Sequence, residues 1–186
     1  MVQTASEMLP LGTGAPDFSL PDVISGLQVR LSDFDDKSAL LVMVICNHCP
    51  FVVHVREELA RIGREYQTKD LGIVAVSAND VEHYPDDAPD KLAAMAEALG
   101  FSFPLLYDES QEYVKALHAA CTPDFFVFDK SRSLVYRGRL DGSRPGNNIP
   151  VTGEDLREAL DAVLDGEPPL ENQLPSMGCN IKWKGL

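Results

Sequence analysis

The sequence predicts an α/β fold, and three observations predict it. An apolar run at 39–45 leads into a segment with helical periodicity, and a second apolar run follows at 73–78. Strand, helix and strand in this order form a right-handed βαβ unit with parallel strands. Two segments rich in apolar and aromatic residues, 125–129 and 134–138, flank a short polar turn and predict an antiparallel hairpin.

The segment after 39–45 carries apolar residues spaced three and four apart, which form one stripe of an amphipathic helix: Val52, Val55, Leu59, Ile62 and Tyr66. Pro50 lacks a backbone N–H, so a helix that began at Cys46 would lose a hydrogen bond there. We therefore expect the regular helix to begin near His48, with Cys46 at its tip.

The remaining elements follow from turn and capping residues. Alternation at 18–20 and 27–31 predicts an early hairpin, and 103–107 reads as an extended segment. The polar, acidic stretch 79–88 predicts a loop, after which a short helix runs over 89–99.

Two further helices are predicted from polar residues at their starts. Asp108 is expected to cap a helix that extends to about Ala120. Thr152 is expected to cap the last helix, which Gly166 ends.

The chain is expected to hold one domain with two terminal extensions. We expect a loose N-terminal arm at residues 1–14, the domain at 15–166, and an irregular C-terminal tail at 167–186. A solvated tail rarely contains a lone tryptophan, so Trp183 predicts that the tail packs on the domain. A length of 186 residues is enough for one full core.

Composition and charge exclude several classes of function. The net charge of −13 disfavours binding to nucleic acid or to an anionic membrane. The longest apolar run is much shorter than a membrane span. Residues 1–10 have neither a basic start nor an apolar core, so we expect no signal peptide and a cytoplasmic protein. Structural disulfides are rare in that compartment, so its cysteines read as working thiols.

Cys46 and Cys49 form a C-x-x-C pair, with Asn47 and His48 between them, where a buried strand turns into a helix. The N–H groups of a first helical turn stabilise a thiolate and lower its pKa. A thiolate attacks disulfides, and a second thiol one turn away can close a ring with it. We expect Cys46 to be the more exposed attacker, with a lowered pKa, and Cys49 to be the resolving thiol.

Other interpretations of the pair remain open. A C-x-x-C can be half of a zinc site, although neither a second C-x-x-C nor a closely spaced histidine pair follows it. We expect no metal, but a non-catalytic metal-binding or interaction module would use Cys46, Cys49 and either Cys179 or His48. Zinc content of the reduced, purified protein separates this from a redox role. Two inert core cysteines are the remaining interpretation.

The whole arrangement resembles the thioredoxin fold, over roughly residues 15–165. The early hairpin and the extra helix make it similar to the redoxin branch, which includes peroxiredoxins and thiol:disulfide proteins. The strings CNHCPFV at 46–52 and GCNIKWK at 178–184 resemble an uncharacterised bacterial group of thioredoxin-like proteins in that branch. The resemblance implies a central mixed sheet flanked by helices, with the early hairpin as an N-terminal extension.

The resemblance also assigns supporting roles. Thr122-Pro123 lies where such proteins have a cis bond facing the C-x-x-C, and an ordinary trans proline is the alternative. In having a histidine just before the second cysteine, this sequence is similar to strongly oxidising members of the fold. His48 would then stabilise the Cys46 thiolate, so His48→Ala would make the protein more reducing. A solvent-facing His48 is the alternative.

The implied activity is thiol:disulfide oxidoreduction. The substrate is a protein or small-molecule disulfide, the electron donor is a thioredoxin-type partner, and no cofactor is implied. A peroxiredoxin-like peroxidase with antioxidant activity is the alternative. Such enzymes resemble this fold but place Thr or Ser three residues before the peroxidatic cysteine and Pro four further back. Those positions hold Met43 and Ala39 relative to Cys46, and Cys46 and Val42 relative to Cys49.

Two further cysteines lie outside the C-x-x-C. Cys121 is two residues before Pro123, and Cys179 lies in the tail. Either is a candidate auxiliary redox thiol, but free cysteines are among the most buried residue types, which favours a packing role for both. We therefore expect a Cys121→Ala, Cys179→Ala double variant to keep its disulfide exchange rate.

Overall fold

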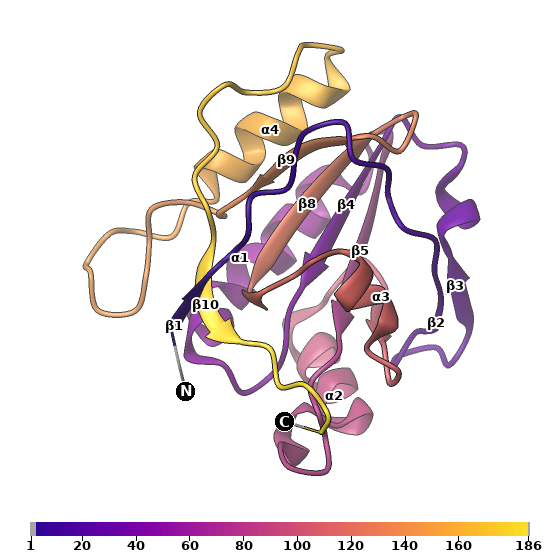
Figure 1. Cartoon of the computed structure of the whole chain (residues 1–186), viewed down its shortest axis with the longest axis vertical. Coiled ribbons are helices and arrows are strands. Elements are labelled where there is room, and N and C mark those ends of the chain that lie inside the picture. Colours follow the sequence, from indigo (N-terminus) through magenta and orange to yellow (C-terminus); the bar gives the residue numbers. More distant parts are fainter. Residues whose placement is uncertain (1–2, 186) are drawn as a thin grey trace.

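A central five-stranded sheet forms the middle layer of the computed structural model, which describes residues 3–185 (Figure 1). Its strand order is β6-β5-β4-β8-β9, with bounds Leu105–Tyr107, Leu71–Ser77, Ala39–Val44, Asp124–Asp129 and Leu134–Gly138. The three strands β4, β5 and β6 are parallel, whereas β8 is antiparallel to both β4 and β9. The predicted βαβ unit and second hairpin therefore join into one mixed sheet, and the α/β, thioredoxin-like fold class is confirmed.

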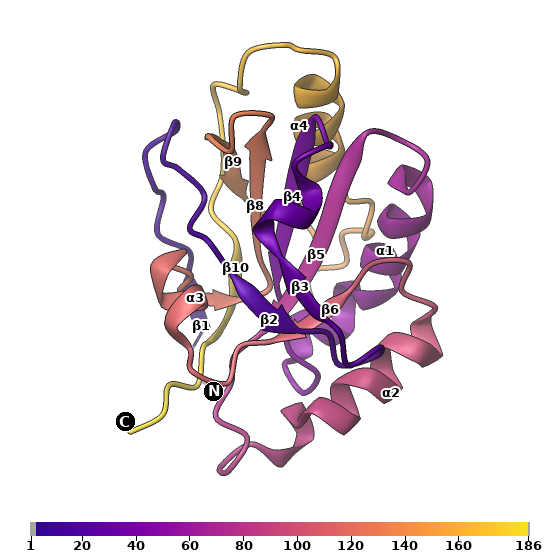
Figure 2. The ribbon, with the colours of Figure 1, turned by 90° about the vertical axis from the view of Figure 1, so that its right-hand side faces the viewer.

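Helices cover both faces of this sheet (Figure 2). Their bounds are Pro50–Tyr66 for α1, Pro89–Leu99 for α2, Glu112–Ala116 for α3 and Glu154–Leu164 for α4. One face of β4, which includes Leu41 and Met43, packs against α1, α2 and α4. The other face, which includes Leu40 and Val42, packs against α3 and the N-terminal segment. Every residue of β4 is buried, which explains its unbroken apolar run.

The early hairpin consists of β2 (Ser19–Pro21) and β3 (Gln28–Arg30), as predicted. Two short 3₁₀ segments complete the connections: η1 (Leu31–Phe34) after the hairpin, and η2 (Pro85–Asp87) within the stretch predicted to be a loop.

Within residues 3–185, no helix combines the length and the apolar character that a membrane crossing needs.

The N-terminal arm is not loose, which corrects the sequence prediction. Strand β1 (Gln3–Ala5) pairs antiparallel with β10 (Met177–Asn180), and β10 pairs in turn with β7 (Cys121–Thr122). The tail predicted to be irregular therefore supplies the central strand of a second, three-stranded sheet. These three segments are too short and too far apart in the chain for a local pattern to reveal their pairing.

Three helix starts also differ from the predictions. Helix α1 begins at Pro50, with Cys49 as its N-cap, because proline is well suited to the first helical position. Helix α3 runs only from Glu112 to Ala116, so it is shorter than predicted, and Asp108 lies before it, although its carboxylate accepts the backbone N–H of Val114 in the first turn. The N-cap of α4 is Gly153, whose φ of 65° lies in the left-handed region. Thr152 does not cap α4, since Asp141 accepts the backbone N–H groups of both Thr152 and Gly153.

Candidate active site

Cys49 occupies the N-cap of α1, beside the first-turn backbone N–H groups that lack partners within the helix. The S–H of Cys46 donates to its sulfur, and the nearby backbone N–H of Val52 also favours the charged form. The side chain is fully buried. The donated S–H of Cys46 is the main reason that the pKa of Cys49 falls to about 5, although burial opposes the shift.

Cys46 follows the end of β4 and is also buried. Its S–H is held by Cys49, and this hydrogen bond, together with burial and the nearby charge of Asp87, raises the pKa of Cys46 well above its ordinary value. The predicted order of the two pKa values is therefore reversed, because the acidic thiol is Cys49, and both sulfurs are buried. The Cys46 S–H contributes most to this shift, and the first turn of α1, which begins at Pro50, adds the nearby N–H of Val52.

Thr122 and Pro123 lie against the pair, and their peptide bond is cis, as predicted. The Thr122 hydroxyl oxygen lies 3.4 Å from Cys46 Sγ, and the Thr122 carbonyl oxygen lies 3.3 Å from Cys49 Sγ. One residue therefore contacts both sulfurs of the C-x-x-C.

The two other cysteines differ in position. The Cys121 thiol donates to the Pro123 carbonyl oxygen at 3.6 Å, and burial raises the pKa of Cys121. Cys179 instead places its sulfur 2.6 Å from the sulfur of Cys49. Burial and this contact raise the pKa of Cys179 to about 12. A packing role alone does not describe a thiol in direct contact with the acidic cysteine.

Asp87, at the end of η2, is a site residue that the sequence analysis missed. Its fully buried carboxylate accepts the backbone N–H groups of Asn47 at 2.7 Å and His48 at 3.0 Å. It also accepts a hydrogen bond from the side chain of Asn79 at 2.7 Å. Asp87 therefore fixes the backbone between the two cysteines. The only sequence signal was its place in an acidic stretch, which reads equally well as a solvated loop.

His48 lies against Asp87, and the effect of His48→Ala on the redox behaviour stays a prediction. Its Nδ1 lies 2.5 Å from the Asp87 carboxylate, and its ring stacks on Tyr84 with 5.5 Å between centroids. Its Nε2 is buried without a hydrogen-bond partner among the residues described. The side chain of His48 is therefore only 16% exposed, and among the residues described it makes no hydrogen bond to the Cys46 sulfur.

Residues 11–137, more than half of the chain, match the AhpC/TSA family. This chain belongs to the AhpC/TSA family. An uncharacterised conserved protein from Geobacillus kaustophilus has a similar structure, with a TM-score of 0.97 and 54% identity over 100% of this chain and 98% of that chain. A hypothetical protein from Sinorhizobium meliloti 1021 has a TM-score of 0.96 and 48% identity over 98% of this chain and 100% of that chain.

A curated relative carries an activity in its name. The thiol-disulfide oxidoreductase ResA from Geobacillus kaustophilus is 28% identical over 86% of this chain and 82% of its own length. Together with the family, this relative identifies the activity: the AhpC/TSA protein described here is a thiol-disulfide oxidoreductase. An enzyme of this class acts on a disulfide substrate and exchanges electrons with a redox partner.

Cys46, His48 and Asp87 form the one cluster of potential metal ligands found within residues 3–185, with ligand atoms within 4.8 Å of one another. The imidazole and the carboxylate already satisfy each other at 2.5 Å, and the carboxylate accepts two backbone N–H groups besides. A cation would have to displace this pairing. The cluster in this AhpC/TSA protein therefore fits a hydrogen-bonded support better than a metal centre.

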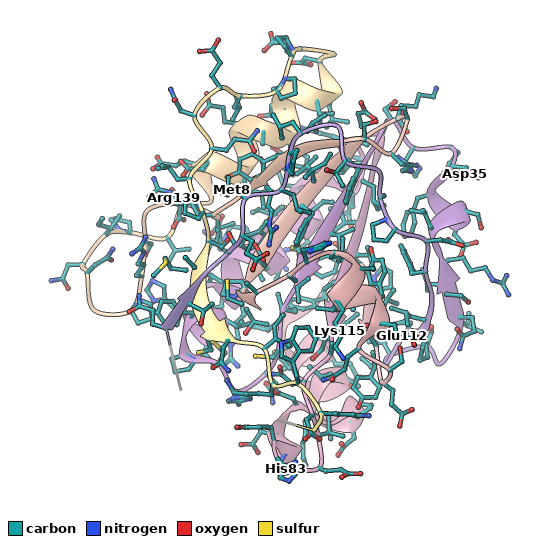
Figure 3. The ribbon with its side chains drawn as sticks, in the orientation of Figure 1. Met8, Asp35, His83, Glu112, Lys115 and Arg139 are labelled. Atoms are coloured by element: carbon teal, nitrogen blue, oxygen red, sulfur yellow. The ribbon has the colours of Figure 1, made fainter. Side chains whose placement is uncertain are left out.

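A pocket opens beside the site. It is lined by residues of α1, of the segment around Pro123 and of the loop after β9, including Phe51, Pro123, Arg139 and Met177. Arg139 lies at the left side of the molecule in Figure 3, next to the start of that loop. The pocket lining combines apolar side chains such as Phe51 with the charged side chains of Arg139 and Asp141, and Arg139 is paired with Asp155.

Asp87→Ala is expected to destabilise the protein by about 2–3 kcal/mol, because two backbone N–H groups lose their buried acceptor. Urea unfolding of the reduced protein measures this loss. Asp87→Asn is the matched control. Asparagine has the same shape and keeps one acceptor oxygen, so this variant should lose clearly less stability than Asp87→Ala. An alanine variant as stable as the parent would show that the carboxylate does not hold the C-x-x-C backbone.

Proposed function

We propose that the Cys49 thiolate attacks the substrate disulfide and that Cys46 resolves the product. The observation that carries this proposal is the position of Cys49 at the N-cap of α1, where Cys46 S–H donates to its sulfur and the first-turn N–H of Val52 lies nearby. The thiolate, and not the thiol, attacks a disulfide, and a pKa of about 5 keeps Cys49 ionised at neutral pH. Both sulfurs are covered in this structure, so a side chain near them has to move before a substrate disulfide reaches Cys49.

The proposed cycle has two exchange steps. First, the Cys49 thiolate forms a bond to one sulfur of the substrate disulfide, and the other substrate sulfur leaves as a thiolate. Second, Cys46 attacks Cys49 in the mixed disulfide, its proton passes to the departing substrate sulfur, and a Cys46–Cys49 disulfide remains. The substrate gains two electrons and two protons in total, the second proton from solvent, and the enzyme is left oxidised.

A dithiol partner returns the enzyme to its reduced form in this proposal. We assign that role to a thioredoxin-type donor and the substrate role to a protein or small-molecule disulfide. The contacts of Thr122 with both sulfurs and the pocket beside Pro123 support docking of the substrate chain there. We further propose a cytoplasmic setting, because reducing partners of this type keep thiols reduced there.

Insulin reduction and peroxide consumption separate this activity from an antioxidant peroxidase. With a thioredoxin-type donor, the parent protein should reduce insulin disulfides, and Cys49→Ser should lower that rate by about 100-fold or more, as removal of a nucleophile does. Peroxide consumption by the parent should stay near the rate without enzyme. Rapid peroxide consumption with no insulin reduction would favour the peroxidase instead.

Trapping identifies the attacking sulfur. A Cys46→Ser, Cys179→Ser variant should accumulate substrate proteins as mixed disulfides on Cys49, because no neighbouring thiol can release them. The matched Cys49→Ser variant should capture none. Capture by Cys49→Ser alone, through Cys46, would restore the roles expected from the sequence and reject the proposed ones. Mass spectrometry of the captured species names the substrates in either case.

A further inference from the structure

Cys179 is held against Cys49 by contacts in both directions. The two sulfurs are 2.6 Å apart, so no atom lies between them. The backbone N–H of Cys179 donates to the Cys49 sulfur, and the backbone N–H of Phe51 donates to the Cys179 sulfur. Strand β10 and the first turn of α1 therefore each supply an N–H to the sulfur of the other.

The backbone of β10 comes close enough for this contact because residue 178 is a glycine. A Cβ atom at Gly178 would lie 2.0 Å from the Thr122 carbonyl oxygen, which no side chain tolerates. The next residue, Cys179, pairs in register with Thr122 across the two strands. Glycine at this position thus allows the strand to pack tightly on Thr122, whose own atoms contact both C-x-x-C sulfurs.

We propose that Cys179 is a second resolving thiol, which forms a Cys49–Cys179 disulfide as an alternative to Cys46–Cys49. This rests on the proposed role of Cys49 as the attacking sulfur. The Cys179 sulfur attacks Cys49 in the mixed disulfide, a Cys49–Cys179 bond forms, and the bond from Cys49 to the substrate breaks. The Cys179 proton passes to the departing substrate sulfur, so no further oxidant is needed.

The two enzyme disulfides interconvert by the same chemistry. Cys46 can attack Cys49 in the Cys49–Cys179 disulfide, which gives Cys46–Cys49 and returns the proton of Cys46 to Cys179. The three sulfurs remain one disulfide and one thiol throughout, so the exchange needs neither an oxidant nor a reductant. The C-terminal strand thereby takes part in the redox cycle, and Cys49 is the sulfur shared by both bonds.

A two-thiol variant tests the bond directly. Cys46→Ser, Cys121→Ser retains Cys49 and Cys179, and oxidised glutathione should convert it to a form with neither thiol open to alkylation and with a Cys49–Cys179 linked peptide. The matched variant Cys46→Ser, Cys179→Ser also retains two thiols, Cys49 and Cys121. It should stop at glutathione bound to Cys49. If Cys179 stays open to alkylation in the first variant while Cys49 carries glutathione, the proposal is wrong.

Gly178→Ala in the Cys46→Ser, Cys121→Ser background tests the geometry. Moving β10 away from Thr122 should slow release of glutathione from Cys49 by about ten-fold or more, because thiol exchange needs direct access to the sulfur. Circular dichroism checks the fold of this variant, and Cys179→Ser in the same background gives the rate without the thiol. Unchanged release in a folded Gly178→Ala variant would count against the role of the strand contact.

These outcomes are independent of the substrate assay. A protein that fails to reduce insulin can still form the Cys49–Cys179 bond with glutathione, and a protein that reduces insulin can lack it. Failure of the third-thiol proposal is therefore distinguishable from failure of the proposed function.

Discussion

The ultraviolet absorbance of the reduced protein is expected to show thiolate formation with a pKa of about 5, and Cys49→Ala is expected to abolish that step. The Cys49 sulfur receives hydrogen bonds from Cys46 S–H, from Cys179 S–H and from backbone N–H groups. Each donor favours the charged form of the acceptor. Cys46 and Cys179, both with raised pKa values, should stay protonated in this range.

Cys46→Ala is the informative control for this titration. It removes the donor that contributes most to the low pKa of Cys49, so the step should remain but move upward toward the value of an ordinary thiol. Cys121→Ala should leave the absorbance step at the same pH, because the Cys121 thiol donates its hydrogen bond to the Pro123 carbonyl oxygen and not to Cys49. If the absorbance step near pH 5 persists in Cys49→Ala, another cysteine forms the thiolate, and Cys49 is not the acidic thiol.

The same shift makes the stability of the reduced protein depend on pH. The pKa of Cys49 is about 5 when folded and about 8.5 when unfolded. Between these values the unfolded chain binds the extra proton, so the contribution to stability grows as pH rises and is lost as pH falls through the folded value. Urea midpoints measured across this window should rise more steeply with pH in the parent than in Cys49→Ala.

Arg137→Met is expected to destabilise the protein by about 3–5 kcal/mol, because it leaves one member of a buried ion pair alone. Arg137 and Asp124 are both fully buried, and Arg137 Nη2 lies 3.2 Å from Asp124 Oδ2. The same nitrogen donates to the His118 carbonyl oxygen at 2.7 Å, and the guanidinium lies over the Phe126 ring. Urea unfolding above pH 7, where Asp124 of the parent protein is ionised, measures the loss.

A double variant separates the charge from the packing. Asp124→Asn, Arg137→Met removes both charges, so it should recover part of the stability lost in Arg137→Met. A double variant less stable than Arg137→Met would show that lost packing, rather than the lone charge, causes the effect. Asp124 directly follows Pro123, so this pair also supports the segment that contacts the two cysteines.

Asp124 gives the opposite pH dependence from Cys49. Burial raises the pKa of its carboxyl to about 7, even though Arg137 acts to lower it. The folded protein therefore holds a proton that the unfolded chain releases near pH 4. Its contribution to stability is fully present below the unfolded value and is lost as pH rises through about 7. Asp124→Asn should flatten this part of the stability profile.

Local patterns in the sequence determined the central part of the fold. The buried runs became β4 and β5, the stripe that includes Val52 and Leu59 became the inner face of α1, and the two segments around the polar turn became β8 and β9. These patterns suffice because each element buries its own apolar residues at a fixed period. The C-x-x-C at a strand-to-helix junction, with a proline ahead of β8, likewise marked the candidate site.

The tertiary structure decided which sulfur carries the charge and what surrounds it. The start of α1 at Pro50 gave the helix N–H groups to Cys49, although a shift of a few residues is invisible in the periodicity. Asp87 and Cys179 are 38 and 130 positions from Cys49 in the sequence, and they reach the site through η2 and β10. Contacts over such separations depend on how short strands and loops pair in space, and no local spacing encodes that pairing.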